Sequence, residues 1–196
     1  MSFGSDDNKA LHADKDHKEF VEQIAALRDL KPSAHRHRTN LWGSVANTTQ
    51  NPLPLQRGDV IFVITDGGDT ASHIQSNELE RTLYKAGIRM FGFALSSSTV
   101  RTDEELAGPS NVCNFARQTG GDCFIIGGRS RMSPQGRQEI QDTIVQFLTE
   151  AVQPYRIELA PSAAALSGKL RIEIVENGIE RKDLVVLAPD RLFPTD

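Results

Sequence analysis

The chain lacks the features that mark several large classes of protein. Two cysteines in 196 residues are too few for a disulfide framework, and their spacing matches no zinc motif. Cys113 and Cys123 flank a predicted helix and the strand after it, so a bridge is open to them, although free, half-buried thiols are the simpler expectation. No window approaches 18 apolar residues, which predicts no membrane span. Residues 1–20 are acidic and polar where a signal peptide needs a basic start and an apolar centre, so we expect no export signal in this chain.

An excess of charge of one sign is also absent. The net charge is −4 and the pI is near 5.7, and the basic run at residues 35–38 is short and has no aromatic platform beside it. These properties argue against a nucleic-acid surface. Neither G-x-x-x-x-G-K-[ST] nor G-x-S-x-G occurs, so the common phosphate-binding and nucleophile motifs are missing. What remains, with 38% hydrophobic and 24% charged residues, is the composition of one well-buried domain with a small appendage.

Predicted strands and helices alternate along most of the chain. Continuous apolar runs indicate strands, and apolar residues at helical spacing indicate helices. This alternation predicts an α/β fold with an open, mostly parallel, doubly wound sheet and helices on both faces. The expected helices cover 17–30, 40–48, 76–86, 111–119 and a long segment from 134 to near 154, and the expected strands cover 59–65, 88–95 and 122–126.

Three local patterns predict finer detail. The run at 59–65 is apolar throughout, which is typical of a strand buried on both faces. Ser76 is expected to cap the helix that follows, and Gly87 to end that helix in a left-handed conformation. Ser133 followed by Pro134 predicts an N-cap and a first helical residue.

The pattern changes after Pro154. Strand-like segments at 155–159, 169–176 and 182–189 are separated by turn residues, and Asn177-Gly178 predicts a hairpin. We therefore expect two parts, an α/β domain over residues 1–153 and a C-terminal antiparallel β extension over residues 154–196.

A group of oxygen donors follows the strand predicted at 59–65. The stretch VIFVITDGGDTAS places Asp66 where the strand ends, and in open parallel sheets ligands bind at the carboxyl ends of strands. A carboxylate followed by two glycines suits Mg²⁺ or Ca²⁺, although one carboxylate needs partner ligands. A turn or N-cap role for Asp66 is the alternative. Asp69 and Thr70 are expected to form hydrogen bonds within the loop.

The order of these segments resembles the von Willebrand factor type A domain. VIFVITDGGDTAS is similar to the fourth strand and loop of that family, and IRMFGFAL to its fifth strand. NFARQTGGDCFII is similar to its late helix and strand, MSFGSDD to the end of its second strand, and HRHRTNLWGSV to the loop and helix that carry an ion-site threonine. The β extension after the last helix is similar to a bacterial, largely acidobacterial, subgroup.

The resemblance implies a metal-ion-dependent adhesion site. Its ligands in the family are a D-x-S-x-S motif after the first strand, one threonine and one aspartate, and the matching positions here are Thr39 and Asp66. For Thr39, an N-cap of the following helix is the alternative. No D-x-S-x-S occurs in these 196 residues, and neither does a segment matching the first strand. The chain could be a fragment, another element or a partner's strand could fill the gap, or the protein could bind no metal. With Thr39 and Asp66 alone, binding of Mg²⁺, Mn²⁺ or Ca²⁺ should be weak or absent.

Three functional hypotheses follow. The first is a non-enzymatic, adhesion-type protein-binding module, in which an unknown partner presents an acidic side chain to the cation. The second is a Mg²⁺-dependent hydrolase of doubly wound fold that uses Asp66, and the third is a structural domain with a dead metal site. Strand exchange over the strand at 59–65 could give a homodimer. The resemblance implies export, whereas the start of the chain argues against it.

Overall fold

The computed structural model describes residues 39–49, 55–96, 102–127, 133–152 and 168–192. The predicted helix at 17–30, the basic run at 35–38, the segment 1–7 and the strand-like segment 155–159 lie outside these ranges. None of the helices in the described ranges is both long enough and apolar enough to cross a membrane. The elements are α2 (Leu41–Thr48), β1 (Val60–Thr65), α3 (Ser76–Ala86), β2 (Arg89–Leu95), α4 (Asp103–Gln118), β3 (Cys123–Ile126), α5 (Pro134–Val152), β4 (Gly168–Lys169), β5 (Val175–Glu176), β6 (Ile179–Glu180) and β7 (Arg191–Leu192).

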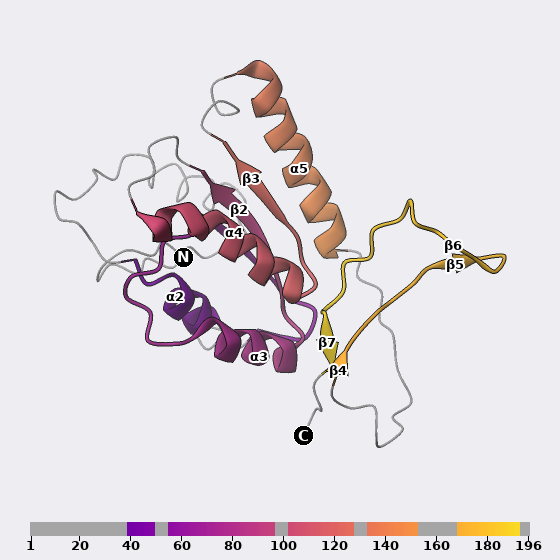
Figure 1. Ribbon diagram of the computed structural model, residues 1–196, viewed down its shortest axis with the longest axis horizontal. Coiled ribbons are helices and arrows are strands. Elements are labelled where there is room, and N and C mark those ends of the chain that lie inside the picture. The colour runs from indigo at the N-terminus through magenta and orange to yellow at the C-terminus, as the bar shows by residue number, and fades with distance from the viewer. Residues whose placement is uncertain (1–38, 50–54, 97–101, 128–132, 153–167, 193–196) are drawn as a thin grey trace, which may run out of the picture.

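The centre of the fold is a parallel sheet in the order β1-β2-β3. Val60 pairs with Arg89 at the start of β1, and Gly92 pairs with Cys123 at the start of β3. Helices connect the strands, so each strand returns to the same end of the sheet (Figure 1). The predicted α/β fold with a mostly parallel, doubly wound sheet is confirmed.

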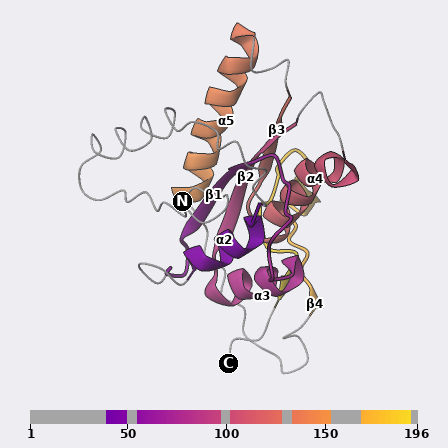
Figure 2. The same ribbon diagram turned by 90° about the vertical axis from the view of Figure 1, so that its left-hand side faces the viewer.

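Helices cover both faces of this sheet. α2, α3 and α4 pack on one face and α5 packs on the other, as Figures 1 and 2 show together. The first face holds the larger core, because side chains of three helices meet alternate residues of all three strands. Its buried members are Leu41, Trp42, Val45, Ile61, Val63, Leu79, Leu83, Ile88, Met90, Ala94, Val112, Cys113, Phe115, Ala116 and Cys123. The second face holds Phe91, Phe93, Ile126 and Phe147.

The prediction that β1 is buried on both faces is wrong. Ile61 and Val63 are buried on the α2 side, but Phe62 is 43% exposed and Ile64 is 65% exposed on the α5 side. α5 lies over β2, where Phe147 packs against Phe91, with ring centroids 5.1 Å apart. On that face, no element among the described residues covers Phe62 and Ile64 fully. A continuous apolar run does not reveal this, because it reads the same for one covered face as for two.

Helix ends follow the predicted chemistry in part. Gly87 ends α3 with φ of 67°, and the Ser133 hydroxyl accepts the Gly136 N–H at 3.0 Å in the first turn of α5, as expected. The N-cap of α3 is Gln75 and not Ser76, which is already helical. α4 begins at Asp103, eight residues before the predicted start at 111, and carries Pro109 inside it.

The C-terminal extension contains less strand than predicted. β4 pairs with β7 and β5 pairs with β6, each over two residues, in antiparallel register. The hairpin between β5 and β6 is confirmed, since Asn177 and Gly178 both have positive φ, at 52° and 80°. The longer strands expected at 169–176 and 182–189 do not form, because those segments stay largely exposed and do not pack on a second sheet.

Cys113 and Cys123 form a disulfide, so the expectation of free thiols is wrong. The bridge joins α4 to the first residue of β3 and lies in the core, with both residues buried. A short turn joins α4 to β3, and the helix packs against the strand, which brings the two sulfur atoms together. Sequence spacing alone does not fix that geometry.

Candidate functional site

The candidate site lies where β1 leaves the sheet. Thr65 is buried at the end of the strand, and its hydroxyl accepts the Gly67 N–H at 3.0 Å. Asp66 is exposed at this edge of the sheet, and its Oδ1 accepts the Gly68 N–H at 3.2 Å. The carboxylate therefore stabilises a local turn through one oxygen while the side chain remains accessible to solvent.

The structure brings Thr39 to the same loop. The Thr39 N–H donates to the Thr70 hydroxyl at 2.8 Å, and the Thr39 carbonyl accepts the N–H groups of Thr70 and Ala71 at 2.8 and 2.9 Å. Two segments about 30 residues apart in sequence are thus joined by three hydrogen bonds. The two residues predicted as metal ligands, Thr39 and Asp66, stand on these neighbouring segments.

Asp69 and Ser72 fix the start of α2 to this loop. Asp69 Oδ1 accepts the Leu41 N–H at 3.0 Å, and the Ser72 hydroxyl accepts the Gly43 N–H at 2.9 Å and donates to Asp69 at 2.6 Å. Asn40, the N-cap residue by position, makes no side-chain cap bond. Asp69 and Thr70 form hydrogen bonds, as predicted. Their partners, however, include residues 39–41 in another segment of the chain and not only residues of the loop. Ser72 was not predicted, because capping rules consider neighbours in sequence and here the cap comes from 29 residues away.

The other side of the loop contacts α4 through two glycines. A Cβ atom on Gly67 would lie 2.1 Å from the Gly108 carbonyl carbon, and one on Gly108 would lie 2.8 Å from the Gly67 carbonyl carbon. Gly67 also has φ of 84°, which residues with side chains rarely adopt. The loop is therefore held between the start of α2 and the backbone of α4.

Few side chains at the carboxyl end of β1 could serve as metal ligands. No group of three or more histidine, cysteine or acidic side chains that could hold a metal ion exists within the part of the chain that the structure describes. Asp66 supplies one accessible carboxylate, while Asp69 Oδ1 already accepts two hydrogen bonds. One carboxylate and the Thr39 hydroxyl fit a weakly held, mostly hydrated divalent cation and do not fit a tight site.

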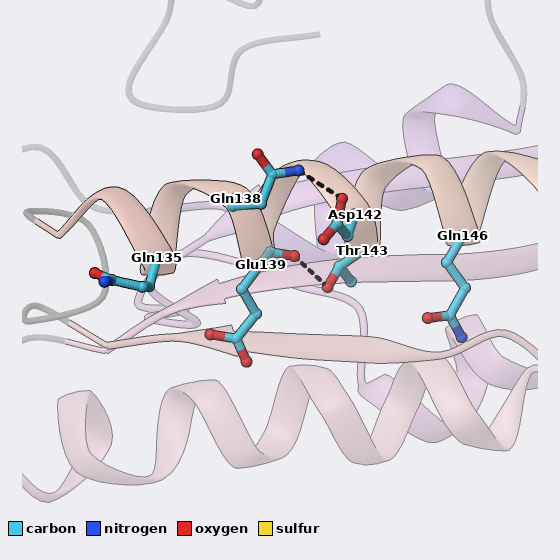
Figure 3. Close-up of a pocket in the computed structure, with 6 residues that line it drawn as sticks. All are labelled: Gln135, Gln138, Glu139, Asp142, Thr143 and Gln146. Carbon is cyan, nitrogen blue, oxygen red and sulfur yellow. Dashed lines mark hydrogen bonds between the residues drawn. The ribbon is translucent and has the colours of Figure 1, made fainter.

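A second polar feature lies on α5. Polar side chains line a shallow hollow of about 400 Å³ on one flank of the helix (Figure 3): Gln135, Gln138, Glu139, Asp142, Thr143 and Gln146. Gln138 donates to Asp142 at 2.8 Å, and the Thr143 hydroxyl donates to the Glu139 carbonyl at 2.8 Å. These hydrogen bonds follow the helical repeat, so the flank reads as the solvated side of an amphipathic helix.

A third polar cluster attaches the C-terminal extension to the α/β domain. The Tyr84 hydroxyl lies 2.6 Å from Asp190 Oδ1 and 2.5 Å from the Gln118 carbonyl oxygen, and it accepts the Asp190 N–H at 3.1 Å. Burial and the bond to Asp190 raise the pKa of Tyr84 well above its usual range. Burial, followed by the charge of Asp190, also raises the pKa of Glu80, while Arg191 opposes this shift. Tyr84 and Asp190 contact each other across the junction, so this cluster has a structural role.

Comparison with known proteins adds one likeness. No family model matches the chain, and no curated protein matches it. The fold is similar to the crystal structure of the conserved hypothetical protein BatB from Bacteroides thetaiotaomicron, at 17% identity and a TM-score of 0.44. The similarity covers 67% of this chain and 70% of that one. The fold assignment therefore depends on the strand order and register described above.

Proposed function

We propose that this protein is a non-enzymatic binding module of the von Willebrand type A kind, with an incomplete metal-ion-dependent adhesion site at the carboxyl end of β1. One observation supports the proposal most directly. Asp66 leaves the core at the edge where open parallel sheets bind ligands, and hydrogen bonds hold the Thr39 segment against the same loop.

In this proposal the cation is bound weakly. The Asp66 carboxylate holds a divalent cation directly or through water, the Thr39 hydroxyl adds a neutral oxygen, and water completes the shell. The cation would supply an open coordination position for an acidic side chain of a partner protein. The loops around this edge would select the partner by shape.

Mn²⁺ offers a direct test, because bound Mn²⁺ with coordinated water accelerates the relaxation of water protons. We expect wild-type protein to enhance this relaxation and Asp66→Ala to lose most of the effect. Asp142→Ala removes a matched exposed carboxylate on α5 and should behave as wild type. Adding N-acetyl-aspartate as an acidic side-chain probe should then lower the enhancement by displacing coordinated water. Equal enhancement by wild type and Asp66→Ala would remove Asp66 from the proposal.

A structural domain with a dead site is the second candidate. Two observations favour it: Asp66 already accepts the Gly68 N–H, and Asp69 is engaged in capping α2. This candidate predicts no Mn²⁺ enhancement with any variant. The hydrolase hypothesis has no such support, since Ser96 and Gly127, which follow β2 and β3 in the described ranges, supply neither an acid nor a base.

We also propose that the protein works outside the reducing cytosol. The buried disulfide between Cys113 and Cys123 supports this, because such bridges persist in oxidising compartments and are rare in the cytosol of most organisms. Protein isolated from its native host under thiol-blocking conditions should carry no free thiol. Recovery of two blocked thiols would contradict the proposed location.

A further inference from the structure

The junction between α3, α4 and the C-terminal extension is the feature from which we draw a further inference. Polar atoms of three segments meet there: the Tyr84 hydroxyl on α3, the carbonyl oxygen of Gln118 at the end of α4, and the N–H and Oδ1 of Asp190 in the extension. Figure 1 shows β4 and β7 of the extension beside the ends of these two helices. A change of protonation at this junction therefore acts on the attachment of the extension.

The close contacts at the junction outnumber the hydrogens available to them. Tyr84 Oη lies 2.5 Å from the Gln118 carbonyl oxygen and 2.6 Å from Asp190 Oδ1. The Asp190 N–H donates to Tyr84 Oη at 3.1 Å and to the Gln118 carbonyl at 3.3 Å. The phenol and the amide supply two hydrogens for these four contacts, and an ionised carboxylate supplies none. One of the two short oxygen–oxygen contacts is then left without a hydrogen between its atoms.

A proton on Asp190 Oδ1 removes this deficit. The carboxyl O–H then donates to Tyr84 Oη, and the Tyr84 O–H donates to the Gln118 carbonyl. The Asp190 N–H occupies the second acceptor position of the phenol oxygen. Hydrogen bonds in such a series polarise one another, so each is stronger than it would be alone.

We propose that the junction of Tyr84, Gln118 and Asp190 is a pH-sensitive switch, in which uptake of one proton by Asp190 tightens the attachment of the extension. The attached form favours this proton because its three oxygens need a third hydrogen, whereas water satisfies the same groups when the extension is detached. Attachment is then tightest at acidic pH and weakens as the pH rises toward neutrality. The proposal does not depend on the cation site.

Charged side chains around Asp190 act on this proton in both directions. Glu80 lies one helical turn before Tyr84, and burial, followed by the charge of Asp190, raises the pKa of Glu80. A negative charge on either carboxylate thus disfavours a negative charge on the other. Arg191 acts in the opposite sense, with its Nε 4.0 Å from Asp190 Oδ1. Solvent screens that pair, because its two side chains are 54% and 45% exposed.

Two contacts beside the junction do not titrate. Thr119 forms an isolated antiparallel bridge with Pro189, and Leu187 packs against the core cluster that contains Phe91 and Phe147. Both contacts hold the neighbouring backbone at any pH. The switch therefore changes how often the backbone around Asp190 opens, and it does not release the whole extension.

Hydrogen exchange of the full chain at pH 7 and at about pH 4.5, corrected for the intrinsic exchange rate at each pH, tests the proposal. The reporting amides are those of Asp190 and of Leu170, whose N–H donates to the Asp190 carbonyl at 2.8 Å. Their protection in wild type should rise by about fivefold at the lower pH, as expected for one added hydrogen bond. Peptides from β2 report global stability at each pH. Equal protection of the reporting amides at both pH values would overturn the proposal.

Two variants should remove the pH response for opposite reasons. Asp190→Asn replaces the protonated carboxyl by an amide that donates to Tyr84 at any pH, so protection should be high at both pH values. Tyr84→Phe removes the phenol oxygen on which the series depends, so protection should be low at both. A response of wild-type size in either variant would overturn the proposal.

Two further variants identify the group that takes up the proton. Asp183→Asn alters an exposed carboxylate of the extension that pairs with Arg181, and it should keep the wild-type response. Glu80→Gln should also respond to pH, because in the proposal the proton that tightens the junction resides on Asp190. Loss of the response in Glu80→Gln together with its retention in Asp190→Asn would assign the proton to Glu80 and overturn the proposal.

Discussion

The Tyr84 hydroxyl and the Asp190 carboxylate lie 2.6 Å apart although 106 residues separate them in sequence. The contact joins α3 to the C-terminal extension, and the Asp190 N–H also donates to the Gln118 carbonyl at 3.3 Å. An isolated bridge pairs Thr119 with Pro189 beside it. The extension is therefore attached to the α/β domain at the end of the sheet opposite to the candidate site.

Removing the Tyr84 hydroxyl should loosen this attachment. Tyr84→Phe deletes a hydrogen bond to a carboxylate, which is worth about 1 kcal/mol or more. Opening of the extension should then become about fivefold more frequent, and limited proteolysis between 168 and 192 should accelerate by a similar factor. Arg181→Gln, which removes two exposed ion pairs within the extension, to Glu176 and Asp183, should leave the cleavage rate nearly unchanged. Unchanged proteolysis of Tyr84→Phe would show that other contacts hold the extension.

Glu80 should lower stability at neutral pH. Its raised pKa means that the folded chain binds this proton more tightly than the unfolded chain does. The stabilisation of the fold by this bound proton is fully present below the ordinary pKa of 4.5, and it is lost as the pH rises through the folded-state pKa. Because the group is partly exposed, Glu80→Gln should raise the free energy of unfolding at pH 7 by only about 0.3 kcal/mol. The gain should vanish near pH 4. Urea unfolding at both pH values measures it.

A control on the same helix separates this effect from a general loss of charge. Glu78 lies in the first turn of α3, where a negative charge interacts favourably with the helix dipole. Glu78→Gln should therefore be neutral or slightly destabilising at pH 7. A stabilisation equal to that of Glu80→Gln would contradict the local explanation.

Asp69 and Asp66 should differ in their effect on stability. Asp69→Ala removes the cap on the Leu41 N–H and should cost about 1–2 kcal/mol. Asp66→Ala removes one exposed, 3.2 Å hydrogen bond and should cost about 0.5 kcal/mol or less. Chemical denaturation without added metal measures both. Equal costs would mean that Asp66 has a larger structural role than its contacts indicate.

Gly67 and Gly68 offer the same kind of comparison. Gly67→Ala places a Cβ atom 2.1 Å from Gly108 at a φ of 84°, so it should cost about 2 kcal/mol or more. At Gly68 the added Cβ would lie 3.6 Å from Asp66 Oδ1, an ordinary contact, and Gly68→Ala should stay within about 0.5 kcal/mol of wild type. Thermal unfolding of the two variants under one buffer condition makes the test.

The disulfide should contribute measurably to stability. The bridge spans ten residues, and closing a loop of this size in the unfolded chain is worth about 2–3 kcal/mol. The double variant Cys113→Ala, Cys123→Ala should lose that amount in urea unfolding. Alkylation of the unreduced, denatured wild type should add no mass, and alkylation after reduction should add two adducts. Two adducts without reduction would show that the thiols are free.

Much of the fold follows from the sequence because the buried strands are unbroken apolar runs. The strands at 59–65, 88–95 and 122–126 were predicted to within one residue of the observed bounds. The first eight residues of α4 were missed, because Gly108-Pro109 is typical of a break, whereas the helix continues through Pro109 with Gly108 packed against the backbone of Gly67. Solvent exposure of Phe62 and Ile64 was also missed, since it depends on where α5 lies.

The candidate site was predictable only at its most local level. Asp66 follows a buried strand, and that position could be read directly from the sequence. The contacts of Asp69 and Ser72 with α2 could not, because they join segments that come together only in the folded chain. The metal roles of Thr39 and Asp66 stay predictions.

The loop after β1 is fastened on two sides, by hydrogen bonds to the start of α2 and by the backbone contact of Gly67 with Gly108. A ligand that binds to this loop meets a surface that needs no rearrangement. Little affinity is then lost to ordering the loop, so even a small contact area can give useful binding. Because the loop is held on both sides, it cannot easily change shape to fit a different ligand. We therefore expect it to discriminate sharply among ligands that differ in shape.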